Sequence, residues 1–214
     1  MAAKTRAMNE WGDVAWSTQP HVFHLPDGER VTVRAIRPQD ANQLQAYVRG
    51  LSDETRRSRF LGAVSELAPA RLDRLTHMAG PGELALLAFV DIGGESPMIA
   101  EAILVTAPHS RRSEIALSVA DAWQRRGLGT WLLRNLECRA RMLGARYMFG
   151  DVLRTNTAMK CLACRAGFVI RSPFTDARLV EIVKDLSMPR SGLPCREQFA
   201  QPLFATGLPG PLSP

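Results

Sequence analysis

Three apolar runs of strand length follow one another near the middle of the chain, each bounded by turn-forming residues. They cover Leu84–Val90, Met98–Thr106 and Glu114–Ala120. Gly93-Gly94 separates the first two runs, and a polar stretch from Pro108 to Arg112 separates the second from the third. Upstream, His21–His24 and Arg30–Ile36 flank the turn residues Pro26-Asp27-Gly28. These spacings predict antiparallel hairpins.

Other segments space their apolar residues three or four positions apart, which is typical of amphipathic helices. Gln39–Val48 and Pro69–Met78 have this pattern, and so does Gly129–Leu143, which ends before a glycine. The strand-like Tyr147–Leu153 follows the third helix and predicts a parallel strand pair, because parallel strands need a crossover. With Leu179–Val183 as a last strand, the sequence predicts an α/β fold with a mixed, mostly antiparallel sheet.

Length and composition indicate one folded domain with two tails. A chain of 214 residues with 46% hydrophobic content can bury one substantial core. Residues 1–20 have no steady period and are expected to form a flexible arm, whereas residues 21–187 form the domain. Residues 188–214 are rich in proline and glycine, which predicts a disordered tail.

Several classes of partner and site are not expected. No apolar run reaches the roughly 18 residues that a membrane span needs. The net charge is +6, but the arginines are scattered without interleaved aromatic residues, which disfavours nucleic acid binding. Cys161 and Cys164 have the spacing of half a zinc site without a second pair, so we interpret them as a buried helical pair and expect no metal. Free cysteines and the lack of a signal peptide favour the cytoplasm.

The segment at 124–130 is the best candidate for chemistry. It reads Gln-Arg-Arg-Gly-Leu-Gly-Thr, follows a predicted strand and leads into a predicted helix. Backbone N–H groups at a helix N-terminus are unpaired and lie at the positive end of the dipole, and glycine lets a phosphate approach them. Arg125 and Arg126 add positive charge. The segment fits neither the Walker pattern nor the dinucleotide fingerprint, and we predict a pyrophosphate site.

The order Gln-x-x-Gly-x-Gly after a strand resembles the acetyl-CoA loop of the GCN5-related N-acetyltransferase (GNAT) family. Two further segments match this family in order. Asn156 opens the helix-like stretch 157–166 before Gly167-Phe168, which is similar to the family's element beside the pantetheine arm. Arg37-Pro38 with Asp40 is similar to the family's entry into its first helix. The resemblance implies the GNAT fold, with helices on both faces of the sheet and the parallel pair at the acetyl-CoA site.

A narrower likeness is to the acetyltransferase domain of bacterial protein lysine acetyltransferases. Residues 121–124 match its Asp-x-Trp-Gln, and residues 113–116, Ser-Glu-Ile-Ala, resemble its Ala-Glu-Phe-Ala. Segments at 27–31 and 51–60 also resemble blocks of that group, so the likeness covers about residues 21–187. It implies that acetyl-CoA is the co-substrate and that a protein lysine is the amine acceptor.

The resemblance also implies roles for single residues. Glu114 would be the general base, acting through a water, and the backbone N–H of Val119 would stabilise the oxyanion. Ala163 stands where many relatives have a tyrosine that protonates the leaving thiolate, and Glu101 is a second candidate base. The residues expected to bind acetyl-CoA are Val119, Gln124, Arg125, Arg126, Gly127, Leu128, Gly129, Thr130 and Asn156.

Other interpretations remain open at this point. Glu114 could be a solvated carboxylate paired with Arg111 or Arg112, and Asn156 could be an ordinary helix cap. For the whole protein, the alternatives are a small-molecule amine N-acetyltransferase and a catalytically weak CoA-binding sensor. The predicted acceptor region is basic, which suits a lysine flanked by acidic residues or an anionic small molecule. Its arginines are Arg49, Arg56, Arg57, Arg59, Arg71 and Arg74.

Overall fold

The computed structural model describes residues 20–25, 27–78, 80–172 and 176–187. Within these residues the chain forms one eight-stranded sheet in the order β1-β2-β3-β4-β5-β6-β8-β7. The strands are β1 (His21–His24), β2 (Arg30–Ala35), β3 (Glu83–Val90), β4 (Met98–Thr106), β5 (Arg112–Val119), β6 (Tyr147–Leu153), β7 (Val169–Arg171) and β8 (Leu179–Asp185). The predicted arm (1–20, except Pro20) and tail (188–214) lie outside the described residues.

Three helices lie between β2 and β3, and two more lie between β5 and β7. They are α1 (Ala41–Gly50), α2 (Asp53–Phe60), α3 (Pro69–Thr76), α4 (Leu128–Met142) and α5 (Thr157–Arg165), with short 3-10 turns at Pro38–Asp40 and Asp121–Trp123. Every neighbouring strand pair is antiparallel except β5 and β6. The predicted mixed sheet with one parallel pair is therefore confirmed.

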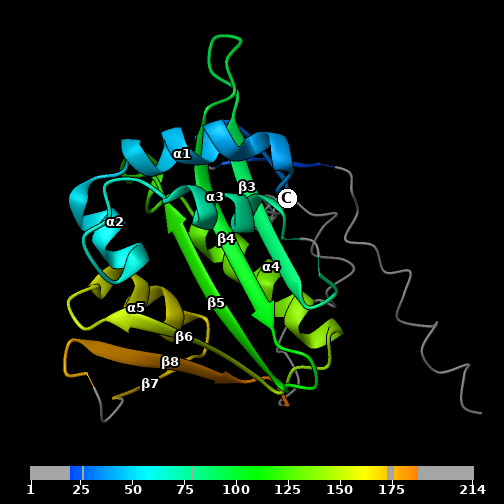
Figure 1. Ribbon diagram of the computed structural model, residues 1–214, viewed down its shortest axis with the longest axis vertical. Coiled ribbons are helices and arrows are strands. Elements are labelled where there is room, and N and C mark those ends of the chain that lie inside the picture. Colours follow the sequence, from blue (N-terminus) through cyan, green and yellow to red (C-terminus); the bar gives the residue numbers. More distant parts are fainter. Residues whose placement is uncertain (1–19, 26, 79, 173–175, 188–214) are drawn as a thin grey trace, which may run out of the picture.

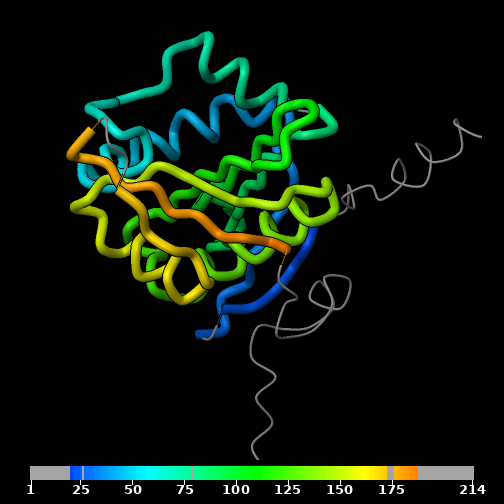
Figure 2. The backbone as a smooth tube through the Cα atoms, turned by 90° about the horizontal axis from the view of Figure 1, so that it is seen from below, coloured from blue at the N-terminus to red at the C-terminus, as the bar shows by residue number. Residues whose placement is uncertain are grey.

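Helices cover both faces of the sheet in three layers (Figure 1). One core cluster joins apolar residues of α1 and α3 to β3 and β4, and a larger cluster joins α4 and α5 to the opposite face. Seen at right angles in Figure 2, the cyan segment of α2 and the yellow α5 lie on opposite sides of the orange β8. A strand exposes successive side chains to opposite faces, so each central strand contributes to both cores.

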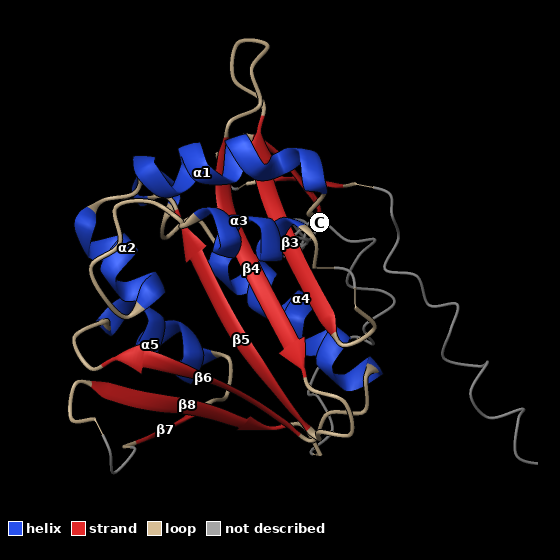
Figure 3. Cartoon of the chain, viewed as in Figure 1, coloured by secondary structure: helices blue, strands red, loops and turns tan. Residues whose placement is uncertain are grey.

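The parallel pair is short, and its two strands separate. Its register joins Arg112 to Tyr147 and Glu114 to Phe149, and no pairing follows. Figure 3 shows β5 and β6 starting at one corner and diverging toward α2 and α5. Gly150 lies at the last close approach, where a Cβ would sit 2.7 Å from the carbonyl oxygen of Ile115. Glycine at this position lets the strands meet before they split.

Candidate active site

A cleft of about 740 Å³ opens where β5 and β6 diverge. Its walls come from β5, the segment after it, the start of α4, β6, α5 and helix α2. The cleft is lined by most of the residues expected to bind a co-substrate, namely Val119, Gln124, Arg125, Gly127, Gly129, Thr130 and Asn156. The structure thus brings together residues from two distant parts of the sequence.

The segment between β5 and α4 has the backbone that a close approach to a ligand requires. Gly127 has φ 89° and is the N-cap of α4, and Arg125 also has a positive φ of 61°. Such values are strained for residues with a Cβ and are often found at ligand sites. Because Gly127, Gly129 and Thr130 line the cleft, the unpaired N–H groups of the first turn of α4 lie at its wall.

Two of the predicted ligand residues point elsewhere. Arg126 forms an ion pair with Asp27 at 3.0 Å and stacks on the Trp123 ring at 4.5 Å. Leu128 is 1% exposed and belongs to the core. The side chain of Leu128 therefore does not reach the cleft, and only its backbone N–H, in the first turn of α4, could contact a ligand. The arginines that line the cleft from the co-substrate side are Arg125 and Arg165.

The backbone of Val119 faces the gap between the strands. Ala120 donates its N–H to the carbonyl oxygen of Ile99 on β4 at 2.8 Å. Successive N–H groups of a strand point to opposite edges, so the N–H of Val119 points away from β4. On the same side, Gln124 donates from Nε2 to the carbonyl oxygen of Val119 at 3.1 Å. This edge of β5 has no β6 partner at that level.

A polar network, which sequence reasoning missed, ties helix α2 to the segment after β5. Asp121 accepts hydrogen bonds from the N–H and the Oγ of Ser52, at 3.0 and 2.7 Å, and from Oγ1 of Thr55 at 2.7 Å. Gln124 donates to the same Thr55 oxygen at 3.3 Å. Burial would raise the pKa of Asp121, but the hydrogen bonds from Ser52 and Thr55 outweigh it and hold that pKa below its ordinary value. The Asp-x-Trp-Gln motif was the available signal, because its two polar residues make these contacts.

We expect Asp121→Ala to lower the free energy of unfolding by about 1–2 kcal/mol, because α2 loses the anchor of its N-terminus. Urea unfolding measures the change. In the wild type, the contribution of the Asp121 carboxylate to the free energy of unfolding is present at neutral pH. It is lost as the pH falls through the lowered pKa of Asp121. Asp53→Ala is the matched control on α2, since Asp53 is exposed and, among the described residues, its ion pair is with Arg56 at the surface. Equal effects of the two substitutions would contradict this role.

The two candidate carboxylates lie on the same face of the sheet in different surroundings. Glu114 is exposed on β5, one residue before the first part of this strand that lines the cleft. Neither Arg111 nor Arg112 forms an ion pair with Glu114, and Arg112 pairs instead with Glu181 at 2.8 Å. Glu101 is 2% exposed, and its Oε1 accepts from Nε of Arg59 at 2.7 Å and from Ser118 Oγ at 3.2 Å. These donors occupy one of the two oxygens of this carboxylate.

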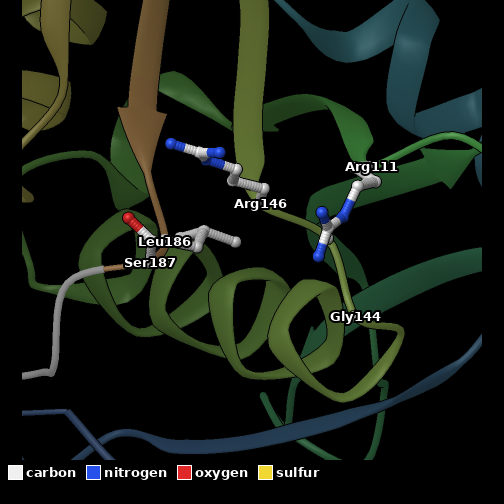
Figure 4. Close-up of a pocket in the computed structure, with 6 residues that line it drawn as sticks. Arg111, Gly144, Arg146, Leu186 and Ser187 are labelled. Atoms are coloured by element: carbon white, nitrogen blue, oxygen red, sulfur yellow. The ribbon is translucent and has the colours of Figure 1, made fainter.

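A second, smaller cavity of about 240 Å³ lies where β8 ends beside the start of β6. Figure 4 shows Arg111 and Arg146, with Leu186 and Ser187 on the Arg146 side. None of the residues predicted to bind a co-substrate lines this cavity. The cleft between β5 and β6 is therefore the candidate active site.

Comparison with known proteins agrees with this geometry. Residues 51–168 match the acetyltransferase (GNAT) family, and this stretch covers more than half of the chain. The protein belongs to the GNAT family. The GNAT chain is 34% identical over 148 residues to acetyltransferase PA5475 of Pseudomonas aeruginosa, which covers 69% of this chain and 80% of that relative. It is an acetyl-CoA-dependent N-acetyltransferase.

Solved GNAT structures have the same fold. The GNAT domain of S. lividans PAT matches with a TM-score of 0.69 and 28% identity, over 83% of this chain and 98% of that domain. The acetyltransferase yncA of Salmonella typhimurium, solved with its cofactor acetyl-CoA, matches with a TM-score of 0.55 and 18% identity, over 76% and 99%. The predicted family and fold are confirmed.

On the α5 side of the GNAT cleft, Asn156 both caps the helix and faces the site. Its Oδ1 accepts from the N–H of Met159 at 2.9 Å, while Asn156 lines the cleft. Both of its proposed roles are thus compatible with the structure. The pair Cys161 and Cys164 is exposed, and the prediction of a buried pair is wrong. The reason is that α5 turns Ala163, which is 0% exposed, toward the core.

No tyrosine of the described residues lines the GNAT cleft. A side chain at position 163 would point into the core. Tyr47 is buried against Ser118, with 2.9 Å between its hydroxyl oxygen and Oγ of Ser118. Burial, reinforced by the charge of Glu101, raises the pKa of Tyr47. Within the described residues, no cluster of three potential metal ligands is found, and no helix has the length and apolar content to span a bilayer.

Proposed function

We propose that the protein transfers the acetyl group of acetyl-CoA to a protein lysine, by direct attack of the amine in a ternary complex. The observation that carries this proposal is the continuity of the cleft, which runs from the start of α4 past Val119 to Glu54, Thr55, Ser58 and Arg59 of α2. A pantetheine arm and an acceptor side chain can approach the edge of β5 from opposite ends. The likeness to the GNAT domain of S. lividans PAT, a protein lysine acetyltransferase, supports lysine as the acceptor.

Glu114 acts as the general base in this proposal. At neutral pH only on the order of one lysine in a thousand is unprotonated, since the reference pKa is near 10.4. Glu114 lies four residues before Ser118, which at about 3.3 Å per residue places their Cα atoms roughly 13 Å apart. A proton must therefore reach the carboxylate through water. Glu114 is exposed and has no ion-pair partner among the described residues, so it is accessible to such water.

The other steps need few side chains. The N–H of Val119 donates to the oxyanion that forms when the amine attacks the thioester carbonyl. Before the attack, the lysine ammonium loses one proton through water to Glu114 and becomes the neutral amine. The nitrogen of the tetrahedral adduct then loses a second proton to solvent, and the carbon–sulfur bond breaks. The leaving CoA thiolate takes a proton from solvent, because a thiol with a pKa near 8.5 does not require a dedicated acid at neutral pH. In the first turn of α4, backbone N–H groups bind the pyrophosphate, with Arg125 beside them.

Mass spectrometry of acceptors incubated with the protein and acetyl-CoA tests the acceptor class. The panel contains folded proteins, lysine peptides and small amines. We expect acetyl groups on lysine side chains of proteins or peptides. Acetylation of small amines alone would replace the proposal with the small-molecule alternative. Binding of CoA without acetylation of any acceptor would replace it with the sensor.

A further inference from the structure

We propose that Arg59 and Arg71 form a carboxylate-binding subsite at the acceptor end of the cleft, which selects lysines flanked by acidic residues. This inference rests on the proposed function, because it assigns the surroundings of the acceptor lysine. Arg59 belongs to α2 and Arg71 to α3.

Arg59 is a cation held in place by one hydrogen bond from its Nε, and its terminal guanidinium nitrogens can still donate. Its side chain is 7% exposed and lines the cleft. Its Nε donates to Oε1 of Glu101 at 2.7 Å, and Ser118 donates to the same oxygen at 3.2 Å. The two terminal nitrogens of Arg59 have no hydrogen-bond partner among the described residues. A buried guanidinium with two free donors matches the geometry of a carboxylate.

Arg71, an exposed residue of α3, brings a second positive charge near Arg59. The guanidinium carbons of Arg59 and Arg71 lie 5.1 and 4.9 Å from the centre of the Phe60 ring. Burial and the charge of Arg59 lower the pKa of Arg71, and the charge of Glu101 partly offsets this effect. Arg71 has no ion pair among the described residues. A carboxylate bound at Arg59 would offset the repulsion between these two positive charges.

The local charges favour a single carboxylate. Glu101 neutralises one of the two arginines, so one net positive charge remains at the subsite. Asp121, another nearby acid, is occupied by Ser52 and Thr55, and Glu54 lines the cleft from the exposed side of α2. Ser118 contacts Glu101 and precedes Val119, whose N–H faces the gap. A carboxylate bound by Arg59 would thus lie beside the point of acyl transfer.

The test compares two blocked peptides in which the lysine is flanked by glutamates or by glutamines. We expect the wild-type protein to acetylate the glutamate peptide with a kcat/KM about tenfold higher, as charge-assisted hydrogen bonds predict. Arg71→Gln should remove this preference by raising KM for the glutamate peptide alone. The matched control is Arg74→Gln on the same helix, which should keep the preference.

Removing Arg59 alone would leave Glu101 buried without its partner and destabilise the fold. The second variant therefore combines Arg59→Gln with Glu101→Gln. Its circular dichroism and its affinity for CoA report whether it folds, and in the folded variant we expect the preference to be lost. A folded double variant that retains the preference would overturn the subsite.

The outcomes separate the subsite from the proposed function. Equal acetylation of both peptides by the wild type overturns the subsite and leaves lysine acetylation intact. If neither peptide is acetylated, the proposed function fails. Calorimetric titration of the peptides into the complex of the protein with CoA then tests whether the subsite exists. Tighter binding of the glutamate peptide that Arg71→Gln abolishes supports it, and equal or absent binding overturns it. A preference for succinyl-CoA over acetyl-CoA that Arg71→Gln removes would assign the carboxylate to the acyl donor and overturn the acceptor subsite.

Discussion

Glu114→Gln should reduce kcat by about 100-fold or more, which is the usual effect of losing a general base. Glutamine keeps the size of the side chain but cannot accept the proton of the lysine ammonium through water. Affinity for acetyl-CoA should stay unchanged, because Glu114 is absent from the cleft wall. Steady-state kinetics with a lysine acceptor measures kcat, and calorimetry measures CoA binding.

The pH dependence of the Glu114 variant adds a second readout. Its activity should rise with pH toward the range in which lysine loses its own proton, near a reference pKa of 10.4. Glu95→Gln, in the exposed turn between β3 and β4, is a matched control and should behave like the wild type. A folded Glu114→Gln protein with full activity would show that the base assignment is wrong.

Gly127→Val should weaken CoA binding by about tenfold to a hundredfold. At φ 89° an L side chain is strained by about 1–2 kcal/mol, and its Cβ would stand at the first turn of α4, where we propose that the phosphate binds. Each 1.4 kcal/mol of lost binding energy is a factor of ten in affinity. Calorimetric titration of CoA measures the effect whether or not the acceptor is a lysine.

Gly144→Val is the control that distinguishes the effect of backbone strain from the loss of a ligand contact. Gly144 also has a positive φ, of 73°, and follows the other end of α4 far from the cleft. We expect this control to lose stability and to bind CoA like the wild type. If the two variants bind CoA equally well, the start of α4 is not the phosphate site.

Much of the fold was predictable because burial leaves a strong periodic pattern. The strands β3 to β5 and the helix α4 have buried faces, and their predicted bounds agree with the structure to within two residues. Helix α2 was missed because it has no buried residue and therefore no apolar period. Strand β7 was missed because its three residues are exposed. Both elements are positioned by tertiary contacts.

The candidate site was predictable where it is contiguous in sequence. The segment 124–130 contains its glycines and Arg125 in one run, and these line the cleft. Contacts between distant residues have no such signal. Ser52 and Asp121 are 69 positions apart, and Arg59 and Glu101 are 42 apart. The exposure of Cys161 and Cys164 could not be predicted from their spacing, because it depends on which side of α5 packs against the core.

Thiol release from acetyl-CoA, followed with and without a lysine acceptor, tests direct transfer in the β5–β6 cleft most directly. We expect thiol release to stay at background without an amine and to increase with the acceptor concentration until it saturates. A stoichiometric burst of thiol in the absence of an amine would reveal an acyl-enzyme and contradict direct attack. Absence of release with every amine, despite bound acetyl-CoA, would contradict lysine acetylation.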